Sequence, residues 1–189
     1  MIFASNNEGK IKEIKEIFKD YDIYSLQDMN INIDIVENKD TFIGNAKKKA
    51  YVIYKLSKMP TMADDSGLMI NCLDGFPGVM THRFLGDVLD SDRNEYLINE
   101  VNKHNDRTAK VVCALAYYDG KGYITAEGVI EGFISDKRKG KNGFGFDEIF
   151  LLDNGKTMAE LSSKEKNKIS ARKLACTILK KKIEKKEYD

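Results

Sequence analysis

The spacing of apolar residues near the N-terminus predicts alternating strands and helices. An apolar run at residues 1–5 precedes a polar loop, and from 11 to 18 apolar residues recur at intervals that place them on one side of a helix. Residues 31–35 alternate isoleucine with polar side chains, which predicts a half-buried strand. A second amphipathic pattern predicts a helix over residues 41–58.

After residue 58 the apolar runs become short and alternate with turn-forming residues. Residues 60–64 and 68–73 each predict a strand, with two adjacent aspartates at the end of the first. The stretch DGFPG at 74–78 is rich in residues that break helices and strands, and it predicts a loop. An apolar stripe over 91–104 predicts a further helix.

The rest of the chain predicts a sheet followed by a helical C-terminus. Residues 108–118, 122–134 and 147–152 predict strands of one sheet, and a basic, glycine-rich loop lies between the last two. Capping-box patterns follow in the sequences TMAE and SSKE. The second predicts the start of one long helix, with these residues facing inward: Ile169, Leu174, Ile178, Leu179 and Ile183.

The mixed order of strands and helices predicts an α/β fold with a mixed sheet rather than a repeated βαβ unit. A length of 189 residues, 42% of them hydrophobic, fits one domain over residues 1–189, built as two small lobes on one core. Lysine and arginine number 31 against 30 aspartates and glutamates, so the balance gives no general attraction to nucleic acid or membranes.

The chain shows none of the sequence signals of secretion or membrane insertion. Its apolar runs are far shorter than a membrane span, and its first residues lack a basic leader before an apolar stretch, so we expect neither anchor nor signal peptide. Cys72, Cys113 and Cys176 are widely spaced among apolar neighbours, which indicates reduced core thiols in the cytosol and neither a disulfide framework nor a zinc site.

The loop between the first strand and the first helix is a candidate anion site. Free N–H groups at a helix start favour an anion, and Lys10 in the first turn is electrostatically misplaced unless an anion lies nearby. The alternative is an ordinary N-cap by Asn6 or Asn7, with Lys10 solvated. The spacing does not match a Walker A motif.

The aspartates Asp64 and Asp65 are the strongest candidates for chemistry. Neighbouring like charges need a cation, a proton to transfer or solvent, and Mg²⁺ prefers carboxylate oxygens, to which Glu37 adds a third group. The alternative is an Asx-type turn led by Asp65. Asn45 and Lys49 lie one helical turn apart on one face, although Lys49 is equally consistent with a solvated lysine run, and Glu37 with a surface carboxylate.

A second candidate region combines aromatic and charged residues. Phe144 and Phe146 flank a glycine and precede Asp147; aromatic faces stack on bases, and a carboxylate can accept a base N–H. The alternative is a hairpin with both rings in the core. Lys166 and Arg172 lie near the start of the last helix, where most such side chains are solvated.

Several segments occur in the order and spacing of one family: ASNNEGKIKEI, ENKDTFIGNAKKKA, ADDSG, GFPGV, GFGFDEIF, GKTMAELSSKEKNKIS and AR. From residue 1 to about 180 the chain resembles the inosine/xanthosine triphosphate pyrophosphatases, the Ham1-like family. The resemblance implies Mg²⁺-dependent hydrolysis of ITP, dITP and XTP to monophosphate and pyrophosphate, which cleanses the nucleotide pool. It also implies a homodimer with an elongated mixed-sheet fold, in which two lobes flank a central active-site cleft; the reduced cysteines add the expectation of a cytoplasmic location.

The resemblance also implies roles for individual residues. Glu37 and Asp65 match Mg²⁺ ligands, and Asp65, next to Asp64, matches the general base. The residues that match phosphate contacts are Ser5, Asn6, Asn7, Glu8, Gly9, Lys10, Asn45, Lys49 and Ser66. The residues that match base and sugar contacts are Phe144, Gly145, Phe146, Asp147, Lys166, Ala171 and Arg172.

The chain departs from the family pattern at two positions. Ala171 stands where the family usually has the histidine of Ser-His-Arg, so we expect a weaker preference for a 6-oxo purine. Phe146 stands where the family often has tyrosine, which keeps the ring and loses the hydroxyl.

Two competing functions follow from the same residues. A nucleotide-binding module without turnover would gain little from carboxylates at 37, 64 and 65 beside phosphates. A nucleic-acid-binding protein that uses the basic residues 136–141 and the lysine-rich C-terminus would carry a clear basic excess, whereas the net charge is +1.

Overall fold

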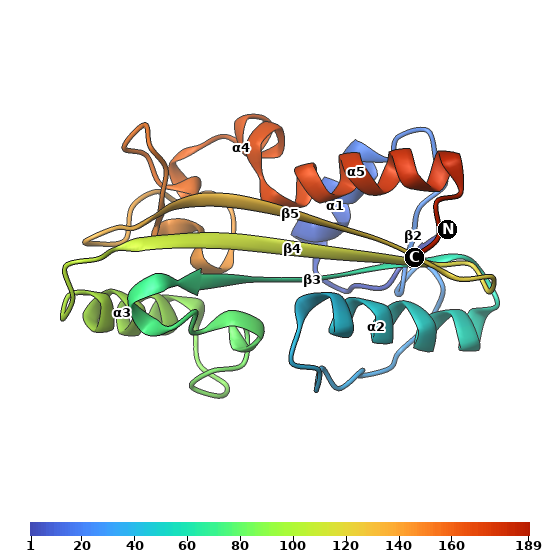
Figure 1. The fold of residues 1–189 in the computed structure, drawn as a ribbon, viewed down its shortest axis with the longest axis horizontal. Coiled ribbons are helices and arrows are strands. Elements are labelled where there is room, and N and C mark those ends of the chain that lie inside the picture. The colour runs from blue at the N-terminus through green and yellow to red at the C-terminus, as the bar shows by residue number, and fades with distance from the viewer. The chain divides into compact units, whose positions relative to one another are not determined.

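The computed structural model describes residues 1–189 and contains one six-stranded sheet with the order β2-β1-β3-β4-β5-β6 (Figure 1). β1 pairs in parallel with β2 and β3, and β5 pairs antiparallel with β6, so the predicted mixed-sheet α/β fold is confirmed. The strands are β1 (Ile2–Phe3), β2 (Tyr24–Ser25), β3 (Thr61–Ile70), β4 (Thr108–Tyr118), β5 (Tyr123–Ile134) and β6 (Phe150–Leu151).

The helices follow the predicted order, and their starts are capped as the sequence indicates. Thr41 caps α2 by accepting from Gly44 N, and Ser162 and Glu165 form a capping box at α4. The α-helices are α1 (Glu8–Ile17), α2 (Phe42–Ser57), α3 (Asp90–Val101), α4 (Ser163–Ile169) and α5 (Ala171–Lys185). Short 3-10 helices are η1 (Asn71–Leu73), η2 (Gly78–Met80), η3 (Gly145–Glu148) and η4 (Met158–Glu160).

The chain divides into two compact units, each made of separate stretches of sequence. β3, β4 and β5 pass from one unit to the other. The first unit consists of Met1–Asp65, Cys113–Gly128 and Ala171–Asp189, and the second consists of Ser66–Val112 and Val129–Ser170.

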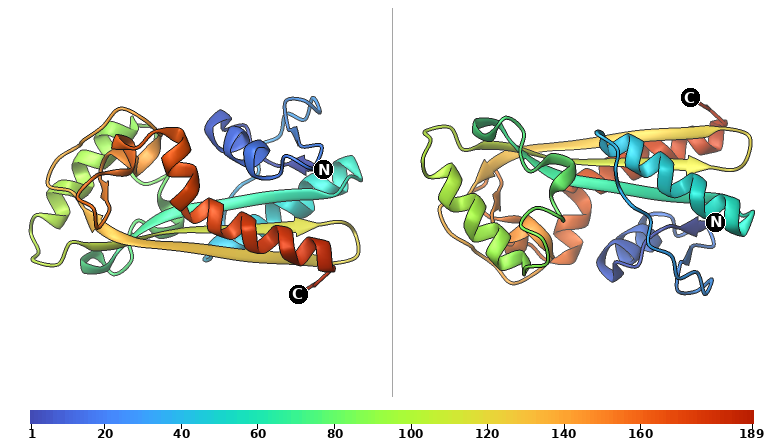
Figure 2. Two further views of the ribbon diagram at one scale, coloured as in Figure 1. Left: turned by 90° about the horizontal axis from the view of Figure 1, so that it is seen from above. Right: turned by 90° about the horizontal axis from the view of Figure 1, so that it is seen from below.

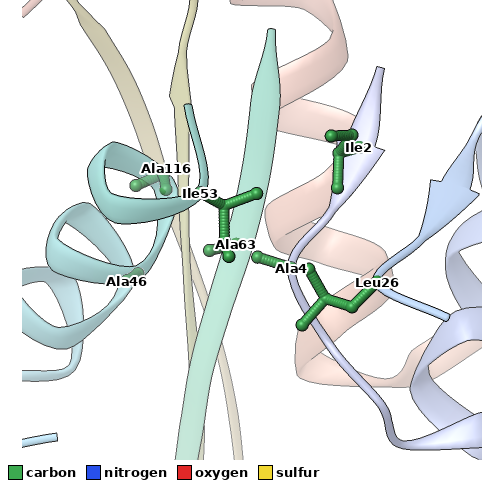
Figure 3. Packing of buried hydrophobic residues seen from close by; sticks show 8 residues of the cluster. Ile2, Ala4, Leu26, Ala46, Ile53, Ala63 and Ala116 are labelled. Carbon is green, nitrogen blue, oxygen red and sulfur yellow. The ribbon is translucent and has the colours of Figure 1, made fainter. Parts of the chain in front are cut away.

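In the first unit α2 covers one face of the strands, and α1 and α5 cover the other (Figures 1 and 2). Small side chains let α2 lie close to the sheet (Figure 3), because Ala46 and Ala50 lie with Ile53 on the stripe of the helix that is buried in the core. On the other face a Cβ added to Gly128 of β5 would lie 2.1 Å from the carbonyl oxygen of Ala171. Glycine at 128 therefore permits the close approach of α5.

The strand predicted at residues 31–35 is absent. This segment has no regular structure, and Ile31 and Ile35 are partly buried against the core of the first unit while Ile33 is exposed. β2 and β1 are neighbours at that edge of the sheet and no further strand follows β2. The loop therefore packs on the core through Ile31 and Ile35 alone, and the alternation of isoleucines did not indicate a strand face.

The two short strands predicted at 60–64 and 68–73 are one strand, and this prediction was wrong. β3 runs from Thr61 to Ile70, and its residues from Thr61 to Leu68 are all buried. The two aspartates therefore lie in the interior of a strand, although the sequence placed them at a strand end. The energetic cost of burying charge at this place is offset by ion pairs, which the sequence pattern does not show.

The single long helix predicted at the C-terminus is two helices. Ser170, between α4 and α5, has an extended backbone with φ −65° and ψ 150°, and this break changes which side of the second helix faces inward. Leu179 is buried as expected, but Ile169, Leu174 and Ile178 are 41–43% exposed. The buried residues of α5 are Ala171, Arg172, Ala175, Cys176 and Leu179.

The cysteines are free thiols; Cys113 and Cys176 are buried as predicted, whereas Cys72 is only half-buried and is not a core thiol. Burial raises the pKa of the Cys113 thiol to about 12, and it also raises that of Cys176 well above its ordinary value. None of the helices is long and apolar enough to cross a membrane.

Candidate active site

Asp64 and Asp65 point to opposite faces of the sheet in the first unit. Successive side chains of a strand alternate between faces. Asp64 meets Lys10 of α1 and Arg172 of α5, whereas Asp65 meets Asn45 of α2. The two neighbouring carboxylates are therefore placed in different surroundings, and each has its own polar partners.

Asp64 is held by two cations in a buried ion-pair network. Lys10 Nζ lies 3.0 Å and Arg172 Nη2 lies 3.1 Å from Asp64 Oδ2, and Arg172 also pairs with Glu13. Burial by itself would raise the pKa of the Asp64 carboxyl, but Lys10, Arg172 and Lys49 outweigh it and hold that pKa well below its usual range. Asp64 therefore remains ionised.

Glu13 also belongs to this network, although it was not among the site residues predicted from the sequence. Its side chain lies on α1, is 7% exposed and pairs with Arg172 of α5. Lys10, Glu13, Ile14 and Phe18 have the spacing of one buried helix face, and all are buried. A lysine and a glutamate at positions that otherwise hold apolar residues were the signal that could have identified the network.

Asp65 is fixed by an amide from the opposite layer. Asn45 Nδ2 donates to Asp65 Oδ2 over 2.8 Å, and Asn45 Oδ1 accepts from the backbone N–H of Lys39 over 2.9 Å. Through these two hydrogen bonds Asn45, which is fully buried, links β3 to the loop that contains Glu37. Asn45 and Lys49 therefore lie on one face of α2, as predicted. Asn45 contacts Asp65, and Lys49 pairs with Glu37.

The environment of Asp65 shifts its proton affinity in the direction opposite to that of Asp64. Burial raises the pKa of the Asp65 carboxyl most, Lys49 lowers it, Glu37 raises it again, and the result is a pKa of about 6. Burial tends to lower the pKa of Lys49, but Asp64, Glu37 and Asp65 outweigh this effect and raise it. Asp65 is therefore a carboxyl group suited to exchanging a proton near neutral pH.

Glu37 and Asp65 have the chemistry of a site for a hard divalent cation. Both are carboxylates near one ammonium group, that of Lys49, and the charge of Glu37 raises the pKa of Asp65. No group of three or more histidine, cysteine, aspartate or glutamate residues is arranged to hold a metal ion. Mg²⁺ commonly binds through one or two carboxylates together with waters and substrate phosphates, so two carboxylates fit this ion.

The loop over residues 5–10 combines an exposed helix start with a buried lysine. Asn7 caps α1 by accepting from Lys10 N over 3.0 Å, and Ser5 Oγ accepts from Asn7 N over 3.1 Å. Asn6, Asn7 and Glu8 are exposed. The ordinary N-cap considered from the sequence is thus present, but Lys10 is not solvated, because it is 9% exposed and paired with Asp64.

In the second unit Phe144, Asp147 and Lys166 form one cluster. Lys166 Nζ lies 2.7 Å from Asp147 Oδ2 and 4.3 Å from the centre of the Phe144 ring. The Phe144 backbone N–H donates to Asp147 Oδ2 over 2.9 Å. Asp147 and Lys166 are buried, whereas Phe144 and Phe146 are only half-buried, so neither ring is a core side chain.

Helix α3 and a neighbouring glycine support this cluster. Asn94 Nδ2 donates to the Gly145 carbonyl over 2.9 Å, and Asp90 Oδ2 accepts from Gly145 N over 3.2 Å. Gly143 has φ +81°, and a Cβ there would lie 2.1 Å from Asp147 Oδ2. Asn94 was not among the site residues predicted from the sequence; a polar side chain on the buried face of α3, close to Leu97, was the signal that could have indicated it.

The remaining predicted site residues are divided between the two units. Ser66 is buried and begins the second unit. Ala171 and Arg172 lie in the first unit, where Ala171 is 2% exposed and Arg172 pairs with Glu13 and Asp64. Their predicted contacts with a purine base stay predictions.

Residues 1–182 match the model of the Ham1 family. The chain belongs to the Ham1 family. The dITP/XTP pyrophosphatase of Bacillus subtilis (strain 168) is 43% identical over 190 residues, which cover 97% of this chain and 96% of that protein. The dITP/XTP pyrophosphatase of Clostridium perfringens (strain 13 / Type A) is 43% identical over 192 residues, which cover 95% and 94%.

Solved structures of the Ham1 family agree with this assignment. The Staphylococcus aureus Ham1 protein is 35% identical with a TM-score of 0.89, and the comparison covers 98% of this chain and 99% of that one. A Ham1 protein from Coxiella burnetii has the same TM-score at 34% identity, over 97% and 98% of the two chains. The family resemblance predicted from the sequence is confirmed, and the Ham1 match includes every candidate residue from Ser5 to Arg172.

Proposed function

We propose that this protein is a Mg²⁺-dependent nucleoside triphosphate pyrophosphatase that converts ITP, dITP and XTP to the monophosphate and pyrophosphate. It is a hydrolase of phosphoric anhydride bonds and removes non-canonical purine nucleotides from the nucleotide pool. Relatives named dITP/XTP pyrophosphatases at 43% identity support the substrate class. The separation of Asp64 and Asp65 onto opposite faces of β3 is the structural observation on which the mechanism rests.

In this mechanism Asp65 is the general base. A water oxygen attacks phosphorus, the anhydride bond between the α and β phosphates breaks, and Asp65 accepts the proton that the water loses. In the absence of a cation the pKa of Asp65 is about 6, so the group is ionised at neutral pH, as a base must be. The hydrogen bond from Asn45 orients the carboxylate. A general base contributes typically about 10²- to 10⁴-fold to a rate.

Phosphate binding is assigned to the start of α1 and to two lysines. The N–H groups at a helix start and its positive dipole end favour an anion, and residues 5–10 provide both. Lys10 and Lys49 add positive charge next to the carboxylates. The Asp64–Arg172–Glu13 network would hold Lys10 in place, because its charges are arranged before a substrate arrives.

Glu37 and Asp65 are the residues that would hold Mg²⁺. When bound, Mg²⁺ neutralises phosphate charge and positions the leaving pyrophosphate. Without a cation, Glu37 and Asp65 repel each other, and Lys49 offsets part of that repulsion.

Base recognition is assigned to the loop of η3. Phe144 and Phe146 present half-buried rings suited to stacking on a purine. Lys166 is a hydrogen-bond donor only, so it suits a 6-oxo group and leaves a 6-amino group without a partner. We also propose that Ser66 and Arg172 contact the substrate, and that the enzyme acts as a homodimer in the cytoplasm.

The deciding experiment measures pyrophosphate release from ITP, dITP, XTP, ATP and GTP, with Mg²⁺ and with EDTA. We expect Mg²⁺-dependent release from the first three and much less from ATP and GTP. A nucleotide-binding module would bind ITP in calorimetry without releasing pyrophosphate. A nucleic-acid-binding protein would retard labelled DNA or RNA in a gel and ignore the nucleotides. Either result would contradict the proposal.

A further inference from the structure

His82 lies against the loop of η3 in the second unit. A Cβ placed on Gly145 would lie 3.8 Å from Cε1 of His82, which is ordinary van der Waals contact. The His82 side chain is exposed. The chain has two histidines, and the other, His104, follows the end of α3.

The backbone around His82 is anchored on both sides. The Thr81 hydroxyl donates to the Gly78 carbonyl over 2.6 Å and accepts from Leu68 N of β3 over 2.9 Å. Phe84, two residues after His82, is buried, and its ring contacts that of Phe76 at 5.2 Å between centroids. A side chain whose flanking residues are fixed in this way is presented in a defined place, which is what precise recognition of a ligand requires.

The other side of this contact is equally fixed. Gly145 is hydrogen-bonded through its carbonyl to Asn94 and through its N–H to Asp90. In the sequence it lies between Phe144 and Phe146, and the Lys166–Asp147 ion pair lies next to the Phe144 ring. One small region of the second unit therefore combines stacking rings, an ammonium, a carboxylate and an imidazole.

We propose that His82 is a specificity-determining residue that contacts the purine base, a role that rests on the proposed function of the η3 loop. A neutral imidazole has one N–H donor and one acceptor nitrogen. Its N–H donates to the 6-oxo oxygen of hypoxanthine or xanthine, alongside Lys166. The 6-amino group of adenine is itself a donor and gives neither side chain an acceptor oxygen. Ala171 leaves this chain without the imidazole that its family usually has after Ser170, and His82 supplies one from another segment.

The first test compares His82→Ala with His104→Ala as the matched control. Loss of one neutral hydrogen bond corresponds to about 2- to 12-fold in affinity. We expect His82→Ala to raise KM for ITP by about this factor, to leave kcat for ITP and both constants for ATP nearly unchanged, and so to lower the ITP/ATP ratio of kcat/KM. His82→Asn, which keeps a donor, should recover part of the ratio, and His104→Ala should leave it unchanged.

An unchanged ratio in His82→Ala, or an equal fall in kcat for both nucleotides, would overturn the proposal. Thermal melting of each variant identifies any loss of folding, and a second measurement needs no variant. Because the chain has two histidines, their imidazole C–H resonances can be followed separately in an NMR titration with inosine, which has no phosphates. We expect the His82 resonance to shift and the His104 resonance to stay.

The two experiments separate the inference from the function on which it rests. If the wild-type protein releases no pyrophosphate from ITP, the proposed function fails, and the inosine titration still tests whether His82 contacts a base. If ITP is hydrolysed but inosine leaves the His82 resonance in place, the function stands and the assignment of His82 is wrong.

Discussion

Asp64 and Asp65 are adjacent in sequence, yet their environments shift their pKa values in opposite directions. Asp64 pairs with Lys10 and Arg172 on one face of β3, and its pKa falls below the usual range. Asp65 accepts from Asn45 on the other face, and its pKa rises to about 6. One residue thus acts as a fixed charge, while the other can exchange a proton.

Replacing the proposed base removes turnover without removing the fold. We expect Asp65→Asn to lower kcat for ITP by about 10²- to 10⁴-fold, because the amide cannot accept the proton from water. Initial-rate measurements of pyrophosphate release check this, with the exposed Asp153→Asn as control. A variant that keeps more than about a tenth of wild-type kcat would remove Asp65 from the mechanism, since even the smallest expected loss is larger.

The raised pKa of Asp65 gives stability a specific pH dependence in EDTA. Folding raises this pKa from 3.8 to about 6, so between these values the folded state binds more protons than the unfolded state. The free energy of unfolding therefore falls as pH rises through this window, on the order of 3 kcal/mol in total. Asp65→Asn lacks the effect.

Urea denaturation of the wild-type protein and of Asp65→Asn at pH 4 to 8 measures this pH dependence of the free energy of unfolding. The stability of Asp65→Asn relative to wild type should increase from pH 4 to pH 6 and then level off. A constant difference over the whole range would show that folding does not shift this group.

Breaking the ion pair between Glu13 and Arg172 weakens the fold. Removing one partner of a buried pair costs about 3–5 kcal/mol, and glutamine, which still accepts a hydrogen bond, should place Glu13→Gln at the low end. In a chain of this size that corresponds to a fall in Tm of roughly 6–12 °C. Calorimetry checks it against Glu184→Gln, an exposed glutamate of α5. Equal Tm values for the two variants would refute a structural role for the pair.

A methyl group at Gly143 displaces the carboxylate of Asp147. The added Cβ would lie 2.1 Å from Asp147 Oδ2, so the ion pair with Lys166 cannot keep its geometry. We expect Gly143→Ala to raise KM for ITP several-fold with a smaller effect on kcat.

Gly155→Ala is a matched control for this substitution. Gly155 has φ +79°, close to the φ +81° of Gly143, but a Cβ there meets nothing within 4 Å. Both variants carry the same backbone strain, and only Gly143→Ala clashes. Identical KM values in the two variants would mean that Asp147 has no part in base binding.

Introducing an imidazole at position 171 tests the departure from the family motif. If the usual histidine helps to hold the base, Ala171→His should raise the ITP/ATP ratio of kcat/KM, chiefly by improving ITP. Ala171 is 2% exposed, so the larger side chain should also cost about 1–3 kcal/mol of stability. Steady-state kinetics, together with melting curves, check both effects. A ratio that stays the same or falls in a folded variant would remove position 171 from base recognition.

The elements that depend on local interactions could be predicted before any tertiary contact was known. The apolar stripe and Thr41 cap of α2, the β4 strand and the capping box at Ser162 all follow from contacts within a few residues along the chain. The ordered family segments likewise determined the family, because their identity and spacing belong to the sequence alone. These features could be predicted without knowing how distant segments meet.

The roles of the charged residues depend on contacts between segments that are far apart in the sequence. Arg172 lies 108 positions from Asp64 and 159 from Glu13, so no local pattern shows that they pair. The same holds for His82 and Gly145, which two separate loops bring together. Burial, and with it the cost of desolvating a charge, is set by elements that are distant in sequence. Two neighbouring carboxylates of the same chemistry could therefore acquire opposite roles only once the sheet had placed them on different faces.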